Sequence, residues 1–319
     1  MDYRYIFRRA LRITRHHKRL LLFAFLAALM LPGRMGLSWR DLPPDVQNRL
    51  VDVVYSDAFI PLVVLAALLA LAVSLTLAVL RALGRAALVQ QANRVENGGA
   101  LDLAAGWKYG KEQAGRVFVV RFLLALPALL VFSLGFTPYI LSAYVFYLPA
   151  GSGEGLGRML ESLGFFLACS LPAVGLALVW LIPARLLQRL AVRACLLEKR
   201  PPRAGIARGW GLVKENAGRI AVLWAALALI DVGLFLFFRL PIAAATAALF
   251  LPLLILIHSS PVVGWVGIAA VISLFWLLGM TVEGLREVLF SVSWTLGYRE
   301  LTGLGRTGEE EWLAESALL

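Results

Sequence analysis

Long apolar runs alternate with shorter basic or mixed segments along this chain of 319 residues. Six of the runs are long enough to cross a bilayer as an α-helix, which takes about 20 residues for ~30 Å of hydrocarbon. These runs cover residues 18–36, 58–80, 117–136, 163–183, 220–238 and 262–282. The pattern predicts an all-α, polytopic membrane protein with six transmembrane helices.

A further apolar segment, residues 242–257, closely follows the fifth run. Its 16 residues include Pro252, which makes it short for a complete span. It is interpreted either as a broken extension of the fifth span or an interfacial segment, or as a seventh span. We favour six spans, because the segment is short and contains proline; a seventh crossing would also place the C-terminal tail outside.

Lysine and arginine concentrate in alternate intervals between the apolar runs. The N-terminal segment carries seven, the interval 81–121 carries seven and the interval 184–219 carries nine, whereas the other three intervals carry three, one and one. Loops rich in Lys and Arg stay in the cytoplasm. We therefore expect the N- and C-termini to be cytoplasmic. The expected location is the bacterial cytoplasmic (inner) membrane. The same alternation explains the net charge of +11 without a nucleic-acid partner.

The composition excludes an ordinary soluble domain. The chain is 60% hydrophobic and 16% charged, with a mean hydropathy of +0.79, against about 45–50% apolar and about 25% charged in soluble domains. Residues 1–31 resemble a signal peptide, but no clear small-x-small cleavage site follows. Cys169 and Cys195 lie in or beside an apolar run, and we expect reduced, packed thiols.

One segment occurs twice in the chain. Residues 106–116 read GWKYGKEQAGR and residues 209–219 read GWGLVKENAGR, with seven of eleven positions identical at an offset of 103. The N-terminal segment fits the same frame at an offset of 97, without the glycine and tryptophan. The internal similarity indicates three copies of one unit.

Apolar or small residues recur at helical spacing in each copy. The aligned positions are Ile6, Ala10, Ile13 and His17; Leu103, Trp107, Gly110 and Ala114; and Ile206, Trp210, Val213 and Ala217. The spacing i, i+4, i+7, i+11 places each set on one face of an α-helix. It predicts a short cytoplasmic interfacial amphipathic helix before each outward span.

The predicted unit is an interfacial helix, an outward span, an external loop and an inward span. The units cover about residues 1–95, 96–198 and 199–300 of a single integral membrane domain, 1–319, and residues 301–319 form an acidic cytoplasmic tail. Each unit begins and ends inside, so the three two-helix repeats are parallel rather than inverted.

The duplicated segment supplies residue types that favour the membrane interface. Tryptophan rings lie in the headgroup layer, lysines reach lipid phosphates and arginines anchor the cytosolic ends of spans. The predicted lipid- and interface-anchoring residues are Trp107, Lys111, Arg116, Trp210, Lys214 and Arg219. Gly115 and Gly218 are expected to permit a bend into the span. The phosphate-loop alternative fails, because neither copy has the GxxxxGK[ST] spacing.

The run 193–230 contains Gly-Trp-x-x-x-Lys-x-Asn-x-x-Arg followed by an apolar span. It resembles the membrane domain attached to some bacterial glycerophosphodiester phosphodiesterases, and its stand-alone uncharacterised bacterial relatives. The resemblance extends through the repeat over about two thirds of the chain. It implies a helical membrane fold and no activity, because those enzymes keep their chemistry in a separate soluble barrel that this sequence does not encode.

Asp231 is the one charge placed deep in a predicted span. It lies 12 residues after Arg219, about 18 Å along a helix. A charge at that depth is expensive and should face protein or water. One interpretation is a structural carboxyl that bonds to Ser133, Ser170 or Ser273. The other is a substrate- or proton-coupling group.

No catalytic signature is present in the sequence. The three histidines, His16, His17 and His258, form no HExxH motif, and no nucleophile or metal-ligand pattern accompanies them. We therefore expect a non-enzymatic protein without cofactor or metal. The favoured function is a lipid-associated, accessory or scaffold role in the envelope, with anionic lipid headgroups as partners and a protein partner or homo-oligomer left open. The alternative is a transporter or permease-like subunit for a small or lipidic solute that uses Asp231.

Overall fold

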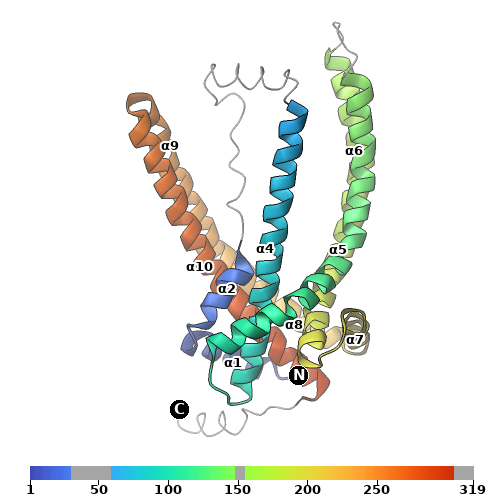
Figure 1. The fold of residues 1–319 in the computed structure, drawn as a ribbon, viewed down its shortest axis with the longest axis vertical. Helices are drawn as coiled ribbons and strands as arrows, with labels where there is room; N and C mark the ends of the chain where they lie inside the picture. Colours follow the sequence, from blue (N-terminus) through green and yellow to red (C-terminus); the bar gives the residue numbers. More distant parts are fainter. Residues whose placement is uncertain (30–58, 148–154, 305–319) are drawn as a thin grey trace. The chain divides into compact units, whose positions relative to one another are not determined.

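The computed structural model describes residues 1–29, 59–147 and 155–304, and every regular element within these ranges is a helix (Figure 1). The helices are α1 (Tyr3–His16), α2 (Leu20–Ala28), α4 (Phe59–Glu96), α5 (Leu103–Tyr147), α6 (Gly155–Leu197), α7 (Pro202–Glu215), α8 (Ala217–Leu234), the π-helical turn η2 (Phe235–Arg239), α9 (Leu240–Ser259) and α10 (Pro261–Thr302).

Five stretches of these helices are long and apolar enough to cross a membrane. They are Pro61–Glu96, Leu103–Gly135, Ser170–Leu197, Ala217–Phe250 and Val262–Thr302. The chain is accordingly an all-helical, multi-pass membrane protein.

The third, fourth and sixth predicted spans lie within α5, α6 and α10. The second, 58–80, lies within α4 from residue 59 onward, and residue 58 lies outside the described residues. The first predicted span, 18–36, is described only as far as residue 29, where α2 contributes nine helical residues. Its remainder lies outside the described residues.

The fifth predicted span and the segment 242–257 belong to one continuous helical run. Arg239 and Leu240 keep right-handed helical backbone angles, so α9 follows η2 without a turn. The helical run ends at Ser260, whose N–H still donates to the carbonyl of Leu256. Residues 242–257 thus continue the helix of the fifth predicted span. Arg239, expected in an external interval, lies in the helix.

The structure shows no helix break at Gly115 or Gly218, where the sequence predicted a bend. Helix α5 continues through Gly115 and Arg116. In the second copy the break falls at Asn216, between α7 and α8, before Gly218. A Cβ atom at either glycine would meet open space. Asn216 leaves helical geometry in the second copy, whereas no residue does so in the first.

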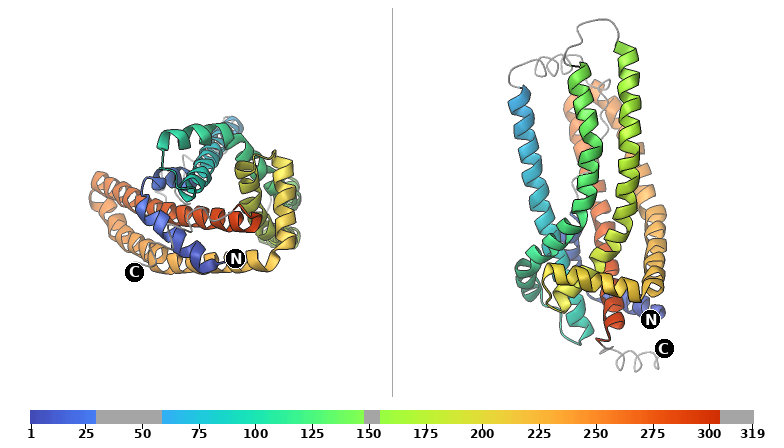
Figure 2. Two further views of the ribbon diagram at one scale, coloured as in Figure 1. Left: turned by 90° about the horizontal axis from the view of Figure 1, so that it is seen from below. Right: turned by 90° about the vertical axis from the view of Figure 1, so that its right-hand side faces the viewer.

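The chain divides into two compact units, and α5, α8 and α10 each continue from one into the other. The larger unit comprises Asp2–Gly115 and Ala225–Leu296 with the tail. In it α2 packs against α4 at Gly84, where a Cβ would lie 2.6 Å from the backbone nitrogen of Ala27. Helices α9 and α10 run side by side in both views (Figures 1 and 2).

The second unit comprises Arg116–Trp224 with Met1 and Gly297–Gly305. Its α5 and α6 segments form a hairpin in which the indole Nε1 of Trp180 donates to the carbonyl of Leu124 at 3.0 Å. Helix α7 packs back along the end of α6. Cys195 of α6 is a buried free thiol on this contact, beside Gly205.

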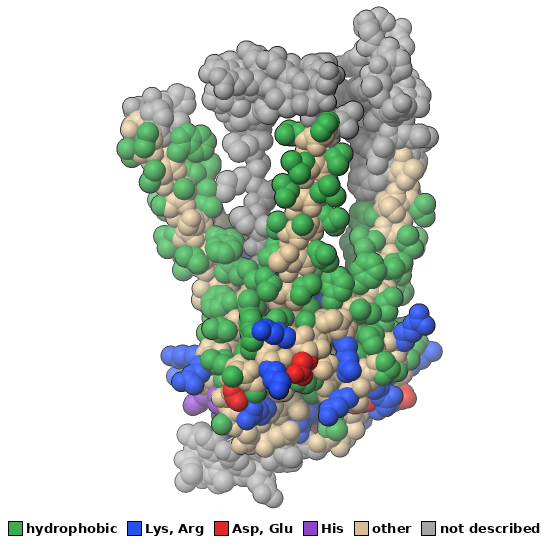
Figure 3. Space-filling view, viewed as in Figure 1, with side chains coloured by type: hydrophobic (Ala, Val, Ile, Leu, Met, Phe, Trp, Pro, Cys, Tyr) green, Lys and Arg blue, Asp and Glu red, His purple; other side chains and the backbone are tan. Residues whose placement is uncertain are grey.

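Within α4 of the larger unit, the buried residues lie in the C-terminal part of the helix. Ala82 and Ala86 are fully buried, whereas Leu65 and Leu69 earlier in the same helix are more than half exposed. Figure 3 shows hydrophobic side chains along most of the visible length of the long helices, and Lys and Arg side chains grouped apart from them. This distribution is typical of helices whose apolar parts face lipid.

Candidate functional site

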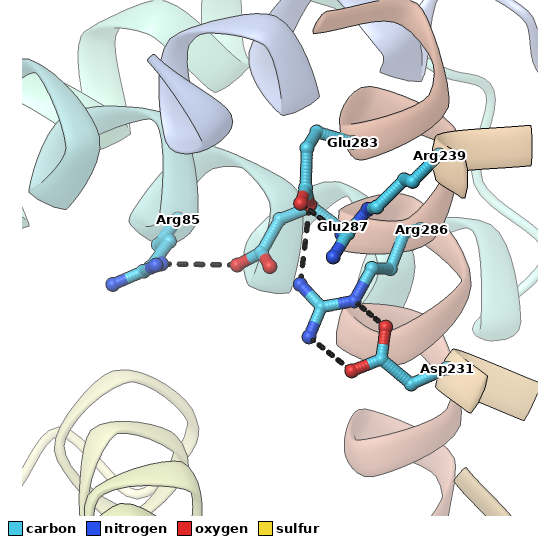
Figure 4. A network of polar contacts seen from close by, with 6 residues as sticks. All are labelled: Arg85, Asp231, Arg239, Glu283, Arg286 and Glu287. Atoms are coloured by element: carbon cyan, nitrogen blue, oxygen red, sulfur yellow. Dashed lines mark hydrogen bonds and ion pairs between the residues drawn. The ribbon is translucent and has the colours of Figure 1, made fainter. Parts of the chain in front are cut away.

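Asp231 of α8 forms a two-point ion pair with Arg286 of α10 (Figure 4). Nε of Arg286 lies 2.5 Å from Oδ1, and Nη2 lies 3.0 Å from Oδ2. The planar guanidinium matches a carboxylate in this geometry and binds it more strongly than a single contact would. The pair joins two helices of the larger unit.

Two further charged residues extend the pair. The Nη1 atom of Arg286 donates to Oε2 of Glu283 at 3.2 Å, and Glu283 also accepts from Arg239 of η2. Each carboxylate and each guanidinium in the set is therefore satisfied by an opposite charge. Such pairing is the expected solution for ionised groups inside apolar helices.

A third pair lies beside this set. Nε of Arg85 in α4 is 3.0 Å from Oε1 of Glu287 in α10. The six residues form the ion-pair network drawn in Figure 4, with three arginines and three carboxylates. Its formal charge is zero, and it fastens α4 and the α8–η2 run to α10.

The π-turn explains how Asp231 and Arg239 face the same partner helix. In a continuous α-helix, residues eight apart differ by about 80° around the axis, while residues seven apart nearly coincide. The η2 turn closes with the N–H of Leu240 on the carbonyl of Phe235, an i→i+5 bond that takes in one additional residue. The additional residue brings Arg239 onto the face of Asp231.

Asp231, the one charge that the sequence placed deep in a predicted span, has a charged partner that the sequence did not indicate. Its partner, Arg286, lies 55 positions later in the chain on the opposing helix. Two of the serines considered as partners bond locally instead, since Ser133 donates to the carbonyl of Leu130 and Ser273 to that of Ala269. The run 217–259 is longer than a bilayer is thick, so counting residues from one end does not fix the depth of Asp231.

The tryptophan and the lysine of each duplicated segment lie in contact. Nζ of Lys111 lies 5.5 Å from the ring centroid of Trp107, and Nζ of Lys214 lies 5.4 Å from that of Trp210. The i, i+4 spacing brings these side chains together, and both distances are within the range of a cation–π contact. The two tryptophans are 37% and 46% exposed. Each pair therefore presents an ammonium group on an accessible aromatic surface.

The two arginines of the predicted set lie farther along the chain. Arg116 is exposed in α5, and Arg219 is exposed at the beginning of α8. Both follow the tryptophan of their segment by nine residues. The predicted anchoring residues thus form two local groups, one on α5 and one on α7 with the start of α8.

The glycine before each tryptophan is a close-packing position. A Cβ at Gly106 would lie 2.8 Å from Cζ of Phe23, and a Cβ at Gly209 would lie 3.0 Å from the backbone nitrogen of Ala191. The protein-facing side of each helix is therefore centred on glycine, and tryptophan points outward. The sequence periodicity missed this shift of one position, because it grouped the tryptophans with the apolar face.

In the second unit, Glu198 follows the last residue of α6 and contacts one tyrosine and two arginines. It accepts a hydrogen bond from the hydroxyl of Tyr298, and Nε of Arg200 lies 2.6 Å from its Oε2. Nε of Arg208 is 3.7 Å from Oε1. Burial alone would raise the pKa of the carboxyl, but the two hydrogen bonds and the charges of Arg200 and Arg208 outweigh it, so the pKa of Glu198 is lowered. Sequence reasoning did not identify this residue.

No group of three or more His, Cys, Asp or Glu side chains in the described ranges is placed to hold a metal ion. Comparison with protein-family models, with curated proteins and with solved structures gave no match. The resemblance to the membrane domain of the phosphodiesterases therefore stays a prediction.

Proposed function

We propose that the chain is a non-enzymatic, lipid-associated protein of the bacterial inner membrane with an accessory or scaffold role in the envelope. The single observation that carries this proposal is the pair of exposed, preformed Trp–Lys contacts, each followed by an arginine. Anionic phospholipid headgroups are the proposed ligands.

The Trp–Lys contacts suit a headgroup for two reasons. The indole ring occupies the interface between hydrocarbon and water, and it holds the lysine stem so that the ammonium is already placed there. Each Lys or Arg near an anionic surface contributes about 1 kcal/mol of attraction. Lys111 with Arg116, and Lys214 with Arg219, supply two such charges in each group.

The proposed architecture has six spans in three parallel two-helix units, each preceded by an interfacial helix. The helices α1, α7 and the start of α5 are the proposed interfacial helices, and both termini are placed in the cytoplasm. Reporter fusions after residues 99, 200 and 303 test this topology. All three should report a cytoplasmic location, and an external signal at any of them would contradict it.

Lipid binding is tested by replacing Lys111, Arg116, Lys214 and Arg219 together with glutamine. Retention of phosphatidylglycerol by the purified protein, followed by native mass spectrometry, should fall at least tenfold, and the residual binding should lose its salt dependence. A matched control replaces Arg15, Lys108, Lys199 and Arg203, which are equally cationic and exposed but are not part of the two groups. The control should lose less than threefold. Equal losses, or no loss in the first variant, would refute the proposed sites.

Transport through Asp231 is the second candidate. The observation in its favour is that 33% of the Asp231 side chain is exposed. The two-point contact with Arg286 supports a fastening role instead, because a coupling group must release its partner during each cycle. Asp231→Asn should therefore leave phosphatidylglycerol retention unchanged while it lowers thermal stability. Solute or proton flux in liposomes that this substitution abolishes would favour transport.

A further inference from the structure

Helix α1 has a protein-facing side and an exposed side of different chemistry. Ile6, Ala10 and Ile13 are buried, and Arg9 turns inward to Glu96. The opposite side presents an arginine stripe at positions i, i+4, i+7 and i+11, which is one helix face. The exposed stripe consists of Arg4, Arg8, Leu11 and Arg15.

The arginine stripe is unneutralised in the described part of the chain. Among the described residues, no ion pair engages Arg4, Arg8 or Arg15, and α1 itself contains no Asp or Glu. Like charges at i, i+4 repel one another along a helix. Leu11, 61% exposed, adds an apolar side chain in the middle of the stripe. The face therefore suits a partner that is acidic and carries apolar groups.

The tail of the same chain has that composition. Residues 305–319 read GRTGEEEWLAESALL, with four glutamates and one arginine. Trp312 and Leu313 lie between Glu311 and Glu315, whose spacing of four equals that of Arg4 and Arg8. The segment thus offers anionic and apolar groups in alternation.

Chain connectivity places the tail within reach of α1. The backbone nitrogen of Met1 lies 3.7 Å from Oε1 of Glu300, near the end of α10, and α1 begins two residues after Met1. Glu309 follows Leu304 by five residues, which extend to about 17 Å, and α1 is about 21 Å long. A tether this short gives an effective concentration on the order of millimolar.

We propose that residues 309–319 bind the arginine stripe of α1. The glutamates face Arg4, Arg8 and Arg15, and Trp312 covers Leu11. As a proposed interfacial helix, α1 lies at the level of the headgroups with its apolar side packed on protein. Its arginine stripe faces the tail rather than the hydrocarbon, since Leu11 is the stripe's one apolar side chain and insertion needs a broad apolar face. The contact does not depend on the proposed lipid sites.

The test uses the full chain in phosphatidylcholine nanodiscs with p-benzoylphenylalanine at position 11. Photolysis and mass spectrometry should identify a crosslink to the peptide that contains residues 309–319. Replacing Glu309, Glu310, Glu311 and Glu315 with glutamine should lower the yield at least fivefold, as should 0.5 M salt. A matched control, Glu112→Gln with Glu215→Gln, removes exposed carboxylates elsewhere and should leave the yield unchanged.

The alternative occupants give different products. A phospholipid adduct, or a crosslink that forms only between two differently tagged copies, overturns the proposal. A yield that the tail substitutions leave unchanged also overturns it. The same photoreactive residue at position 108, on the exposed side of α5, should give no tail crosslink, and an equal yield there would show that the tail has no preferred contact.

Discussion

Helix α4 contains two stretches with opposite surroundings. Its most apolar window, within Pro61–Glu96, has 0% of its residues buried, and Leu65 and Leu69 are exposed there. Its last 15 residues, 82–96, are mostly buried, although they include Arg85, Gln91 and Glu96. Hydrophobicity and burial thus run in opposite directions along one helix.

The difference teaches what drives packing in this protein. Lipid tails are as apolar as leucine, so leucines gain little by leaving them, and helices associate through close contacts and hydrogen bonds instead. Gln91 illustrates this: its Nε2 donates to the carbonyl of Asp102 at 2.8 Å, and its Oε1 accepts from the N–H of Asp102 at 3.2 Å. Substitutions in the polar half should therefore have the larger effects.

The largest effect is expected from Glu96→Ala. The substitution removes the acceptor of the Tyr5 hydroxyl, at 2.8 Å, and leaves the buried guanidinium of Arg9 without this carboxylate. Breaking a buried pair by removing one partner costs roughly 3 kcal/mol or more. Thermal unfolding in detergent should show the loss, and a change below 0.5 kcal/mol would contradict the assigned role.

Gly106→Ala is expected to destabilise by about 2 kcal/mol, because its Cβ would overlap Phe23 and Gln91, both buried. The matched control lies in the same helix. Gly115→Ala meets open space, and replacing a helical glycine by alanine stabilises by up to about 1 kcal/mol. If the unfolding free energy falls in Gly106→Ala and rises in Gly115→Ala, the close approach of Phe23 and Gln91, rather than helix propensity, explains the glycine at position 106.

The π-turn permits a paired deletion and insertion. Deleting Phe237 places Asp231 and Arg239 seven positions apart, so an ordinary α-helix restores their common face, and the expected loss is below about 1 kcal/mol. Inserting an alanine after Phe237 turns Arg239 away from Glu283 by about 100° and should cost more. If the deletion were the more harmful change, the register explanation would be wrong.

A smaller, pH-dependent effect is expected at Glu198. Its lowered pKa means that the folded state favours the carboxylate, so this stabilisation is present above the ordinary pKa of glutamate and is lost as pH falls through the lowered value. Wild-type protein should therefore lose more stability than Glu198→Gln between neutral pH and pH 3, as melting curves would show. Parallel curves would argue against this role.

The smallest effect is expected in the apolar half of α4. Leu68 is 58% exposed, so Leu68→Ala should change stability by less than about 0.5 kcal/mol in a lipid environment. A loss of 2 kcal/mol or more would mean that a helix covers this face, and the contrast between the two halves of α4 would fail.

The helical membrane class was predictable, because it depends on long apolar runs, and a Trp–Lys contact is within reach of sequence reasoning, because it depends on local spacing. Trp107 and Lys111 are one helical turn apart, and the chain geometry brings them together. The partner of Asp231 was not predictable in this way. In the sequence Arg286 follows an apolar run, as an arginine at the cytoplasmic end of a span does. Only the packing of α8 against α10 brings its guanidinium to Asp231.

The same limit applies to glycine. Gly106 and Gly115 belong to one motif and read alike in the sequence, yet the first packs against Phe23 and the second meets open space. Close approach is a property of two helices, so a single segment carries no sign of it. The helix break lies at Asn216, two residues before the glycine at which it was expected.

The neutrality of the ion-pair network has an electrical consequence. A potential of 100 mV does about 2.3 kcal/mol of work on each elementary charge that crosses the whole membrane. Three arginines and three carboxylates held together present no net charge to that field, so small movements of α8 against α10 are electrically silent. Asp231→Asn would leave one unbalanced positive charge, and the stability of this helix pair would then depend on the membrane voltage.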